Sequence, residues 1–244
     1  MKNYIKNKLP PYVRRPLGYL FNRAREVTTT PFTHETIAAL VKKTDPAILE
    51  IGCNDGSDTL GFLRVMPRAK IYCFEPDPRA IARFKNQLGS CLDKVKLFEV
   101  AVSDRPGRIE FHTSSGCPPW PGKLPEGWDQ SGSIRRPKNH LREDPWVKFE
   151  KIISVNTCRL DDWCAENCVK HVDFIWMDVQ GAEGDVIAGA SKILEQTRFM
   201  YTEYSNNELY EGQLSLKDLL ARLPSFKVVA RYPANVLLRN TKFA

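Results

Sequence analysis

Buried-strand patterns alternate with amphipathic-helix patterns along most of this 244-residue chain. In the first pair, the apolar run AILEIG at 47–52 is typical of a buried strand, and a helix pattern follows at 58–66. A strand, a helix and a second strand in succession form a parallel sheet with helices on its faces. Further strands are predicted at 70–76, 95–103, 108–112, 151–157, 172–179 and 199–204, and further helices at 34–43, 77–88, 159–168, 182–196 and 215–223.

The last two predicted strands are connected differently. FKVVARYP at 226–233 and NVLLRN at 235–240 are joined through the short segment YPAN. A connection this short cannot hold a crossover helix, so the two strands are expected to form an antiparallel hairpin at one edge of the sheet. The sequence therefore predicts an α/β fold with a doubly wound, mainly parallel sheet and an antiparallel C-terminal hairpin.

The bulk composition fits one α/β domain of ordinary size. With 42% apolar residues, the chain can bury a sizeable core. It has no run of about 18 apolar residues that would span a membrane, and its basic N-terminus lacks the continuous apolar segment of a secretory signal. The seven cysteines are odd in number and mostly isolated, so we expect them to be reduced and the protein to be cytoplasmic.

The net charge is concentrated at the N-terminus. Residues 1–31 carry a net charge of +6 out of +7 for the whole chain. The sequence therefore divides into a basic arm at 1–31 and a nearly neutral domain at 32–244, and the basic pI is weak evidence for nucleic-acid binding by that domain. Tyr, Leu and Phe side chains between the cations favour peripheral contact of the arm with the inner face of a membrane. A solvated arm and an oligomer contact stay open as alternatives.

The turn GCNDG at 52–56 follows the first strand directly. Gly52 permits a sharp turn, and Gly56 lets the backbone approach a ligand closely. Glu75 ends the next strand, 19 residues after Gly56. That spacing is typical of a carboxylate that binds the two hydroxyls of a ribose. The sequence therefore predicts half of a nucleoside-binding site at the carboxyl ends of these strands.

Charge around the turn indicates which nucleoside cofactor binds. A dinucleotide pyrophosphate favours the G-x-G-x-x-G spacing, which is absent here. Glu50, Asp55 and Asp58 surround the turn with negative charge, which repels a pyrophosphate but suits the sulfonium and amino groups of S-adenosylmethionine. We therefore expect S-adenosylmethionine as the cofactor and disfavour a dehydrogenase.

Five motifs in chain order, within residues 48–203, resemble those of the FkbM family of S-adenosylmethionine-dependent methyltransferases. GCNDG resembles the family's G-A-N-x-G turn, and FIWMDVQGAEGDVIAGA at 174–190 resembles its hallmark D-V-E-G-A-E-x-x-V-L-x-G-A. One departure is visible, because Gln180 stands where the hallmark has its first Glu. The other three matching segments are FEPDP at 74–78, VAVSDRPGRIEFH at 100–112 and SVNTCRLDDW at 154–163.

The resemblance implies a class I (Rossmann-like) methyltransferase with a seven-stranded sheet. It also implies methyl transfer from S-adenosylmethionine to an oxygen, often a sugar hydroxyl in a glycan, a glycolipid or a natural product, as in polysaccharide biosynthesis. A nucleic-acid methyltransferase and a non-catalytic S-adenosylmethionine-binding module of the same fold are the alternatives. The first is disfavoured because the chain lacks the D/N-P-P-Y/F motif of amino-group methylation.

The expected cofactor site combines the glycine turn with residues at the ends of the neighbouring strands. Glu50 is expected either to reach the methionine amino group or to order the loop, and Glu75 is expected to bind the ribose. Ser103 ends the third predicted strand, where many methyltransferases contact the adenine. The full expected set is Glu50, Gly52, Cys53, Asn54, Asp55, Gly56, Glu75, Pro76, Ser103 and Asp178.

Two acids at strand ends are the candidates for catalysis. A sugar hydroxyl is a poor nucleophile at neutral pH, so a base or a Lewis acid must assist. Asp178 and Glu203 are the expected catalytic residues, with Glu183 and His140 as further candidates. Alternatively, Asp178, Glu203 and Asn206 bind Mg²⁺ through their oxygens.

The segment 113–150 has little periodicity and is rich in Pro, Gly, Trp and charge. Long irregular segments in compact domains are often binding loops. The tryptophans and arginines favour an inserted loop that binds a sugar or glycan acceptor. The residues that carry this prediction are Trp120, Trp128, Trp146, Arg135, Arg136 and Lys138.

Overall fold

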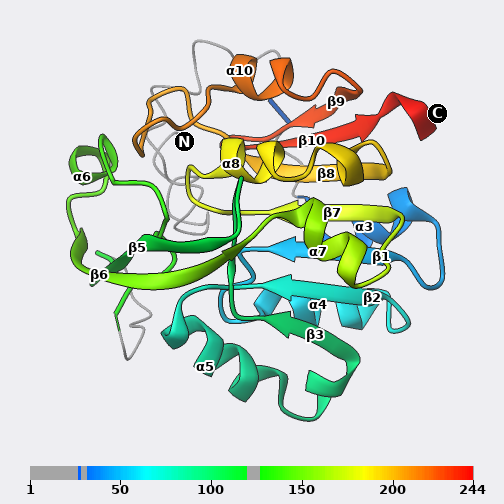
Figure 1. Cartoon of the computed structure of the whole chain (residues 1–244), viewed down its shortest axis with the longest axis horizontal. Helices are drawn as coiled ribbons and strands as arrows, with labels where there is room; N and C mark the ends of the chain where they lie inside the picture. The colour runs from blue at the N-terminus through cyan, green and yellow to red at the C-terminus, as the bar shows by residue number, and fades with distance from the viewer. Residues whose placement is uncertain (1–26, 29–31, 120–126, 244) are drawn as a thin grey trace, which may run out of the picture.

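The computed structural model describes residues 27–28, 32–119 and 127–243, and it contains a seven-stranded sheet in the order β3-β2-β1-β7-β8-β10-β9 (Figure 1). Neighbouring strands from β3 to β8 run parallel, while β10 is antiparallel to both β8 and β9. The sheet confirms the predicted fold class and the C-terminal hairpin. Its strands are β1 (Ala47–Ile51), β2 (Lys70–Phe74), β3 (Val95–Phe98), β7 (Val172–Met177), β8 (Thr197–Glu203), β9 (Phe226–Arg231) and β10 (Asn235–Asn240).

Helices cover both faces of this sheet, and each face has its own apolar core. Ile37, Phe62 and Phe84 represent one core, beneath α3, α4 and α5. Trp163 and Leu219 represent the other, beneath α7 to α10. No helix of the described residues is long and apolar enough to cross a membrane. The helix bounds are α3 (His34–Val41), α4 (Ser57–Val65), α5 (Pro78–Leu88), α7 (Leu160–Glu166), α8 (Glu183–Ala188), α9 (Ser191–Leu194) and α10 (Leu216–Ala221), with 3₁₀ turns at Gly89–Lys94 and Thr241–Phe243.

A second, three-stranded sheet in the order β4-β6-β5 lies beside the main sheet (Figure 1). It consists of β4 (Ala101–Val102), β5 (Gly107–Gly116) and β6 (Val147–Cys158), and α6 (His140–Glu143) lies between β5 and β6. The strand predicted at 95–103 is therefore divided, because β3 pairs with β2 whereas β4 pairs with β6. The ends of the segment 113–150 belong to the long β5–β6 ribbon rather than to an irregular loop.

Local sequence accounts for the helix starts near the sheet edge. The Asp77 side chain accepts a hydrogen bond from the Arg79 backbone N–H, and Pro78 occupies the first turn of α5.

The single helix predicted at 182–196 is wrong, since the chain forms α8 and α9 with a break at Gly189. A Cβ on Gly189 would lie 2.1 Å from the Ser103 carbonyl oxygen, so glycine allows this close approach.

Candidate active site

The carboxyl ends of β1, β2, β7 and β8 open into a cavity of about 690 Å³. This is the position at which ligands bind in open α/β sheets, and the volume suits a small-molecule cofactor. The turn after β1 forms one wall, and residues 129–134 of the insertion form another. Residues 32–35, just before and at the start of α3, close the end opposite the β2 terminus.

The turn after β1 is tied to strands on both sides. The Gly52 and Cys53 backbone N–H groups donate to the Phe74 carbonyl oxygen at 2.9 and 3.1 Å, and Asp178 N–H donates to the Ile51 carbonyl oxygen at 2.9 Å. Gly52 has φ +85°, and a Cβ there would lie 1.9 Å from the Asp178 carbonyl oxygen. Only glycine therefore lets the ends of β1 and β7 approach each other at the cavity.

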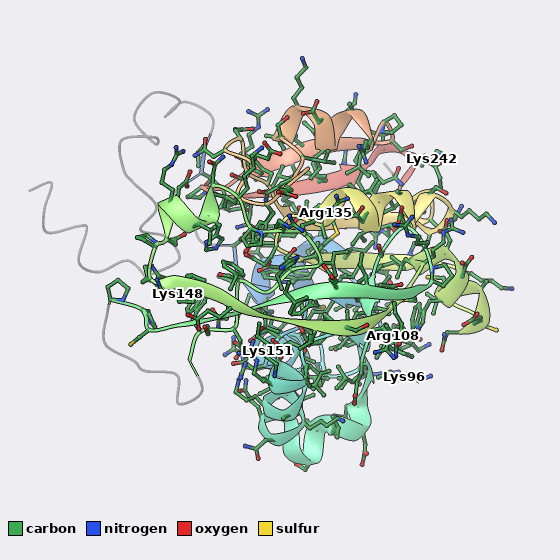
Figure 2. All side chains as sticks on the ribbon, turned by 60° about the vertical axis from the view of Figure 1, so that its left-hand side comes forward. Lys96, Arg108, Arg135, Lys148, Lys151 and Lys242 are labelled. Atoms are coloured by element: carbon green, nitrogen blue, oxygen red, sulfur yellow. The ribbon has the colours of Figure 1, made fainter. Side chains whose placement is uncertain are left out.

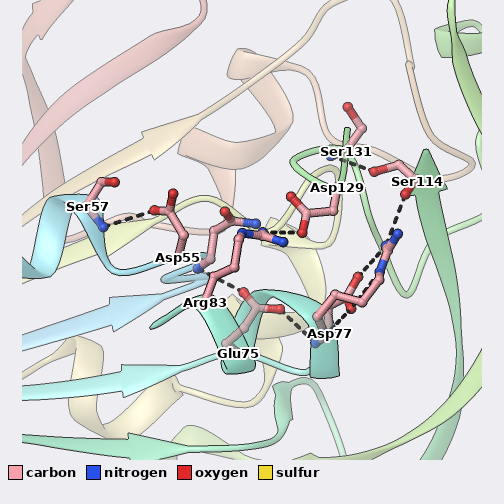
Figure 3. A network of polar contacts seen from close by, with 10 residues as sticks. Asp55, Ser57, Glu75, Asp77, Arg83, Ser114, Asp129 and Ser131 are labelled. Atoms are coloured by element: carbon pink, nitrogen blue, oxygen red, sulfur yellow. Dashed lines mark hydrogen bonds and ion pairs between the residues drawn. The ribbon is translucent and has the colours of Figure 1, made fainter. Parts of the chain in front are cut away.

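Glu75 is buried at the end of β2 and lines the cavity. Its Oε2 accepts a hydrogen bond from Asn54 N–H at 3.0 Å, and its Oε1 accepts one from Asp77 N–H at 2.8 Å (Figure 3). Burial raises the pKa of Glu75 to about 8, and the nearby charges of Asp77 and Asp129 act in the same direction. Each carboxylate oxygen keeps a second lone pair, so Glu75 can still accept hydrogen bonds from a ligand.

Other residues of the predicted turn also line the cavity. Cys53, Asn54, Asp55 and Pro76 all contribute to its wall. Asn54 has φ +44°, and its buried Oδ1 atom has no hydrogen-bond partner among the described residues. A buried amide oxygen of this kind fits a ligand that brings a donor group. Gly56, at φ +81°, begins α4, where a Cβ would meet the Leu88 and Phe84 side chains.

Three expected cofactor residues, Glu50, Gly56 and Ser103, lie away from the cavity wall. Glu50 is fully buried, and its Oε2 accepts a 2.6 Å hydrogen bond from the Thr59 hydroxyl on α4. Burial raises the pKa of Glu50 well above its usual range, so its position favours ordering of the turn over contact with an amino group. Ser103 is buried beside Gly189, and at this level Val100, Ala101 and Val102 line the cavity instead.

Gln180 joins the two candidate catalytic acids. Its Nε2 atom donates to Asp178 Oδ1 at 2.6 Å and to Glu203 Oε2 at 3.0 Å. Its Oε1 lies 3.1 Å from the Tyr210 hydroxyl, and its backbone has φ +51°. All three polar side chains from 178, 180 and 203 line the cavity. An amide therefore separates the two carboxylates at the position where the family hallmark has a third acid.

The remaining catalytic candidates lie elsewhere. His140 packs in α6 against Phe149 and Tyr210, with ring centroids 5.3 and 5.4 Å away, and does not line the cavity. Glu183 is buried and accepts a 3.1 Å hydrogen bond from Gly181 N–H, while burial raises its pKa to about 7. Neither side chain lines the cavity, because His140 is held by aromatic packing and Glu183 by the turn before α8.

The predicted Mg²⁺ ligands are not brought together as a set. Asn206 Oδ1 accepts a 3.4 Å hydrogen bond from Leu216 N–H at the start of α10 and does not line the cavity with Asp178 and Glu203. Among the described residues, no group of three or more His, Cys, Asp or Glu side chains is arranged to hold a metal ion. Asn206 is therefore removed from the predicted ligand set. The two acids that remain, Asp178 and Glu203, both accept hydrogen bonds from the Gln180 amide.

An aromatic wall that the sequence reasoning missed lines the end of the cavity opposite Glu75. Phe32 stacks on Tyr201 with ring centroids 4.4 Å apart, and the His34 ring lies nearly parallel to Trp176 at 6.0 Å. All four side chains line the cavity. His34 Nε2 also lies 3.2 Å from Asp58 Oδ1. We call Phe32, His34, Trp176 and Tyr201 the aromatic wall. No local sequence signal marks it, since its members come from the segment before α3, the start of α3, β7 and β8.

The tryptophans and cations expected to bind the acceptor have other contacts. Trp128 packs edge-on against Trp146 at 5.1 Å and donates to the Ser131 hydroxyl. Arg135 forms an ion pair with Asp185 on α8. Figure 2 shows Arg135 between the β5–β6 ribbon and that helix. Along the ribbon, Figure 2 shows the exposed side chains Arg108, Lys148 and Lys151. Trp120 and almost all of the arm at 1–31 lie outside the described residues.

The strand order, the glycine turn after β1 and the buried acid at the end of β2 together define a class I methyltransferase. Residues 50–232 match the Methyltransferase FkbM domain, and the chain belongs to that family. The chain is also similar to the 2-O-methyltransferase NoeI of Sinorhizobium fredii, with 54% identity over 98% of each chain. The family match and this similarity confirm the predicted S-adenosylmethionine-dependent O-methyltransferase.

Two further comparisons describe more distant similarity. The chain is 27% identical over 198 residues to the AMB antimetabolite synthetase AmbE of Pseudomonas aeruginosa, a match that covers 73% of this chain but 9% of that protein. Among solved structures, a methyltransferase from Geobacter sulfurreducens is similar with a TM-score of 0.46 and 14% identity, and the match covers 98% of this chain and 94% of that one.

Proposed function

We propose that this protein methylates a sugar hydroxyl, at position 2 of the sugar ring, in a glycan, glycolipid or natural product. The single observation that carries the proposal is the lining of the cavity. Glu75 and the turn after β1 lie at one end, and the aromatic wall lies at the other with Asp178 and Glu203 beside it. The similarity to a protein named 2-O-methyltransferase supports the choice of position. Aromatic faces present broad apolar surface, which suits the apolar face of a sugar ring.

The chain's own residues fit S-adenosylmethionine at the nucleoside end. When bound, this cofactor supplies an electrophilic methyl group on a sulfonium. Glu75 is buried with spare lone pairs and would accept hydrogen bonds from the ribose hydroxyls. Asn54 Oδ1, unpartnered among the described residues, would accept one from another donor of the cofactor. Cys53, Asp55 and Pro76 complete the proposed contact surface.

At the other end, we assign Asp178 as the group that takes the proton from the acceptor hydroxyl. The Gln180 amide holds its carboxylate at 2.6 Å and so fixes its orientation. Glu203 lies on the second side of the same amide and would add to the negative field around the acceptor. Much of the rate would come from holding the hydroxyl oxygen and the methyl group in line. Mg²⁺ assistance at Asp178 and Glu203 stays a second proposal, tested by EDTA.

The test is label transfer from methyl-labelled S-adenosylmethionine onto a panel of free and oligomeric sugars. The matched control is each active sugar already methylated at its 2-hydroxyl. The proposal expects label on the free sugar and none on the blocked one. Equal labelling of both forms would overturn position 2, and labelling of RNA or DNA in preference to any sugar would favour the nucleic-acid alternative. Cofactor binding without transfer to any acceptor would favour the non-catalytic module.

The arm at 1–31 and the insertion at 113–150 keep their proposed roles in location and acceptor binding. For the arm, we propose peripheral contact with an anionic membrane surface through its seven cations. Sedimentation with anionic vesicles, comparing the full chain with a chain that lacks residues 1–25, tests this. Unchanged sedimentation of the shortened chain would contradict the membrane contact and favour a solvated arm or an oligomer contact.

A further inference from the structure

A buried carboxylate from the insertion faces the nucleoside end of the cavity. Asp129 is 4% exposed and lines the cavity, although it lies 54 residues beyond Glu75 in the chain. Its Oδ2 atom forms an ion pair with the Arg83 guanidinium of α5. Its Oδ1 atom is buried and has no hydrogen-bond partner among the described residues. One half of this carboxylate is therefore satisfied by the protein, and the other half is available to a ligand.

The position of Asp129 is held from several directions. Ser131 N–H donates to the Ser114 hydroxyl of β5 at 3.1 Å, and the Tyr210 hydroxyl lies 2.8 Å from the Ser131 carbonyl oxygen. Arg83 holds the carboxylate itself from α5, the helix that begins just after Glu75 (Figure 3). Asp129 is thus a fixed group on the wall of the cavity.

Asp129 lies at the same end of the cavity as Glu75. Both residues line the same cavity, and the charge of Asp129 also acts to raise the pKa of Glu75. Figure 3 shows the contact of Asp129 with Arg83 and the contact of Glu75 with Asp77 in one close view. A ligand part that reaches Glu75 therefore also reaches the neighbourhood of Asp129.

The chemistry of Oδ1 selects the ligand group. A carboxylate only accepts hydrogen bonds, and a buried acceptor without a partner destabilises the protein. The adenosine part of S-adenosylmethionine carries three donors: the two ribose hydroxyls and the exocyclic amino group. Each of them would satisfy Oδ1, whereas the ring nitrogens of adenine, which are acceptors, would not.

We propose that Asp129 Oδ1 accepts a hydrogen bond from a donor of the adenosine part of S-adenosylmethionine, so that the insertion completes the cofactor site. This inference rests on the proposed function. It changes the role expected for the insertion, which then contributes to cofactor binding as well as to acceptor binding. Arg83 is a positioning residue in this arrangement, because it acts on the ligand only through Asp129.

Calorimetric binding of S-adenosylhomocysteine to Asp129→Asn tests the proposal without any acceptor. The asparagine oxygen can still face Arg83, which leaves an N–H₂ group facing the adenosine donor. The expected result is a loss of affinity of about tenfold or more, the usual worth of a hydrogen bond to a charged group. The matched control is Asp185→Asn, which likewise removes the negative charge of an arginine ion pair of the insertion but lies outside the cavity lining, and it should bind normally.

Analogues identify the donor and separate contact from folding. Wild type and Asp129→Asn are compared on S-adenosylhomocysteine and on its 2′-deoxy, 3′-deoxy and 6-unsubstituted purine forms. The affinity ratio between the two proteins should approach 1 for the one analogue that lacks the contacted donor. A ratio that is the same for all four ligands, or equal affinity of the two proteins for S-adenosylhomocysteine, would overturn the proposal.

Thermal unfolding of the free proteins checks that the variant is folded, and Asp129→Ser is the second variant if it is not. Serine is too short to reach the same donor, so it should give the same dependence on the analogue. Failure of the wild-type protein to bind S-adenosylhomocysteine would count against the proposed function itself. Normal wild-type binding with an unaffected variant would count only against Asp129.

Discussion

Binding of the cofactor at Glu75 should release a proton. Glu75 is buried in the free protein with a pKa of about 8, so at pH 7 its carboxyl group is mostly protonated. Donors that face its oxygens favour the ionised form and therefore lower this pKa. The apparent affinity for S-adenosylhomocysteine should increase with pH, by up to about tenfold per pH unit below about pH 8, and then level off.

The same group makes the stability of the ligand-free protein depend on pH. Its pKa is raised in the folded state, so between the unfolded value of 4.5 and about 8 the folded protein binds more protons than the unfolded chain. The free energy of unfolding therefore falls as pH rises through this window, by at most about 1.4 kcal/mol per pH unit for one group. Glu183, with a pKa raised to about 7, and Glu50 act in the same direction.

Calorimetry at pH 7 in two buffers of different ionisation enthalpy measures the protons released. About one proton is expected for the wild-type protein, and close to none for Glu75→Gln, which should also lose affinity by about 1–3 kcal/mol. Glu183→Gln is the matched control, because it removes a buried acid outside the cavity lining and should keep the proton release. No proton release together with an affinity that is constant from about pH 6 to 8.5 would refute the assignment.

Three further perturbations test other parts of the site. Asp178→Asn should lower turnover by a factor of roughly 10²–10⁴, while cofactor affinity stays within several-fold. Full activity of this variant would exclude Asp178 both as the base and as a metal ligand. Activity of the wild-type protein that survives EDTA would exclude the Mg²⁺ proposal. Gly52→Ala should lower the free energy of unfolding in urea by about 2–4 kcal/mol, because its Cβ would lie 1.9 Å from a carbonyl oxygen. Gly89→Ala, which also has positive φ but no atom within 4 Å of its Cβ, is the control and should cost less, because it adds backbone strain without the steric clash. Phe32→Ala should raise the acceptor KM several-fold and leave cofactor affinity unchanged, and an unchanged KM would contradict the aromatic wall as an acceptor surface. Trp128→Ala tests the proposed acceptor binding by the insertion separately in the same assay.

The order of strands and helices follows from local patterns in the sequence. Apolar runs bounded by glycine, proline and caps marked β1, β2 and β7, and the short YPAN connection required the hairpin of β9 and β10. The positions of Gly52, Glu75, Asp178 and Glu203 at one edge also follow from the sequence, because the carboxyl ends of parallel strands meet there. The sequence showed that Gln180 replaces the first Glu of the hallmark, but only the structure places its amide between the two acids.

Tertiary contacts alone decided the rest. Phe32, Trp176 and Tyr201 form one wall although no short segment contains them, and His140 is held in α6 by aromatic packing away from the cavity. Asp129 lines the cavity together with Glu75, and Arg83, far away in sequence, pairs with its carboxylate. The physical reason is that hydrophobic periodicity and turn chemistry act over a few neighbouring residues, whereas the partner of a buried polar or aromatic side chain is determined by which segments the sheet brings side by side.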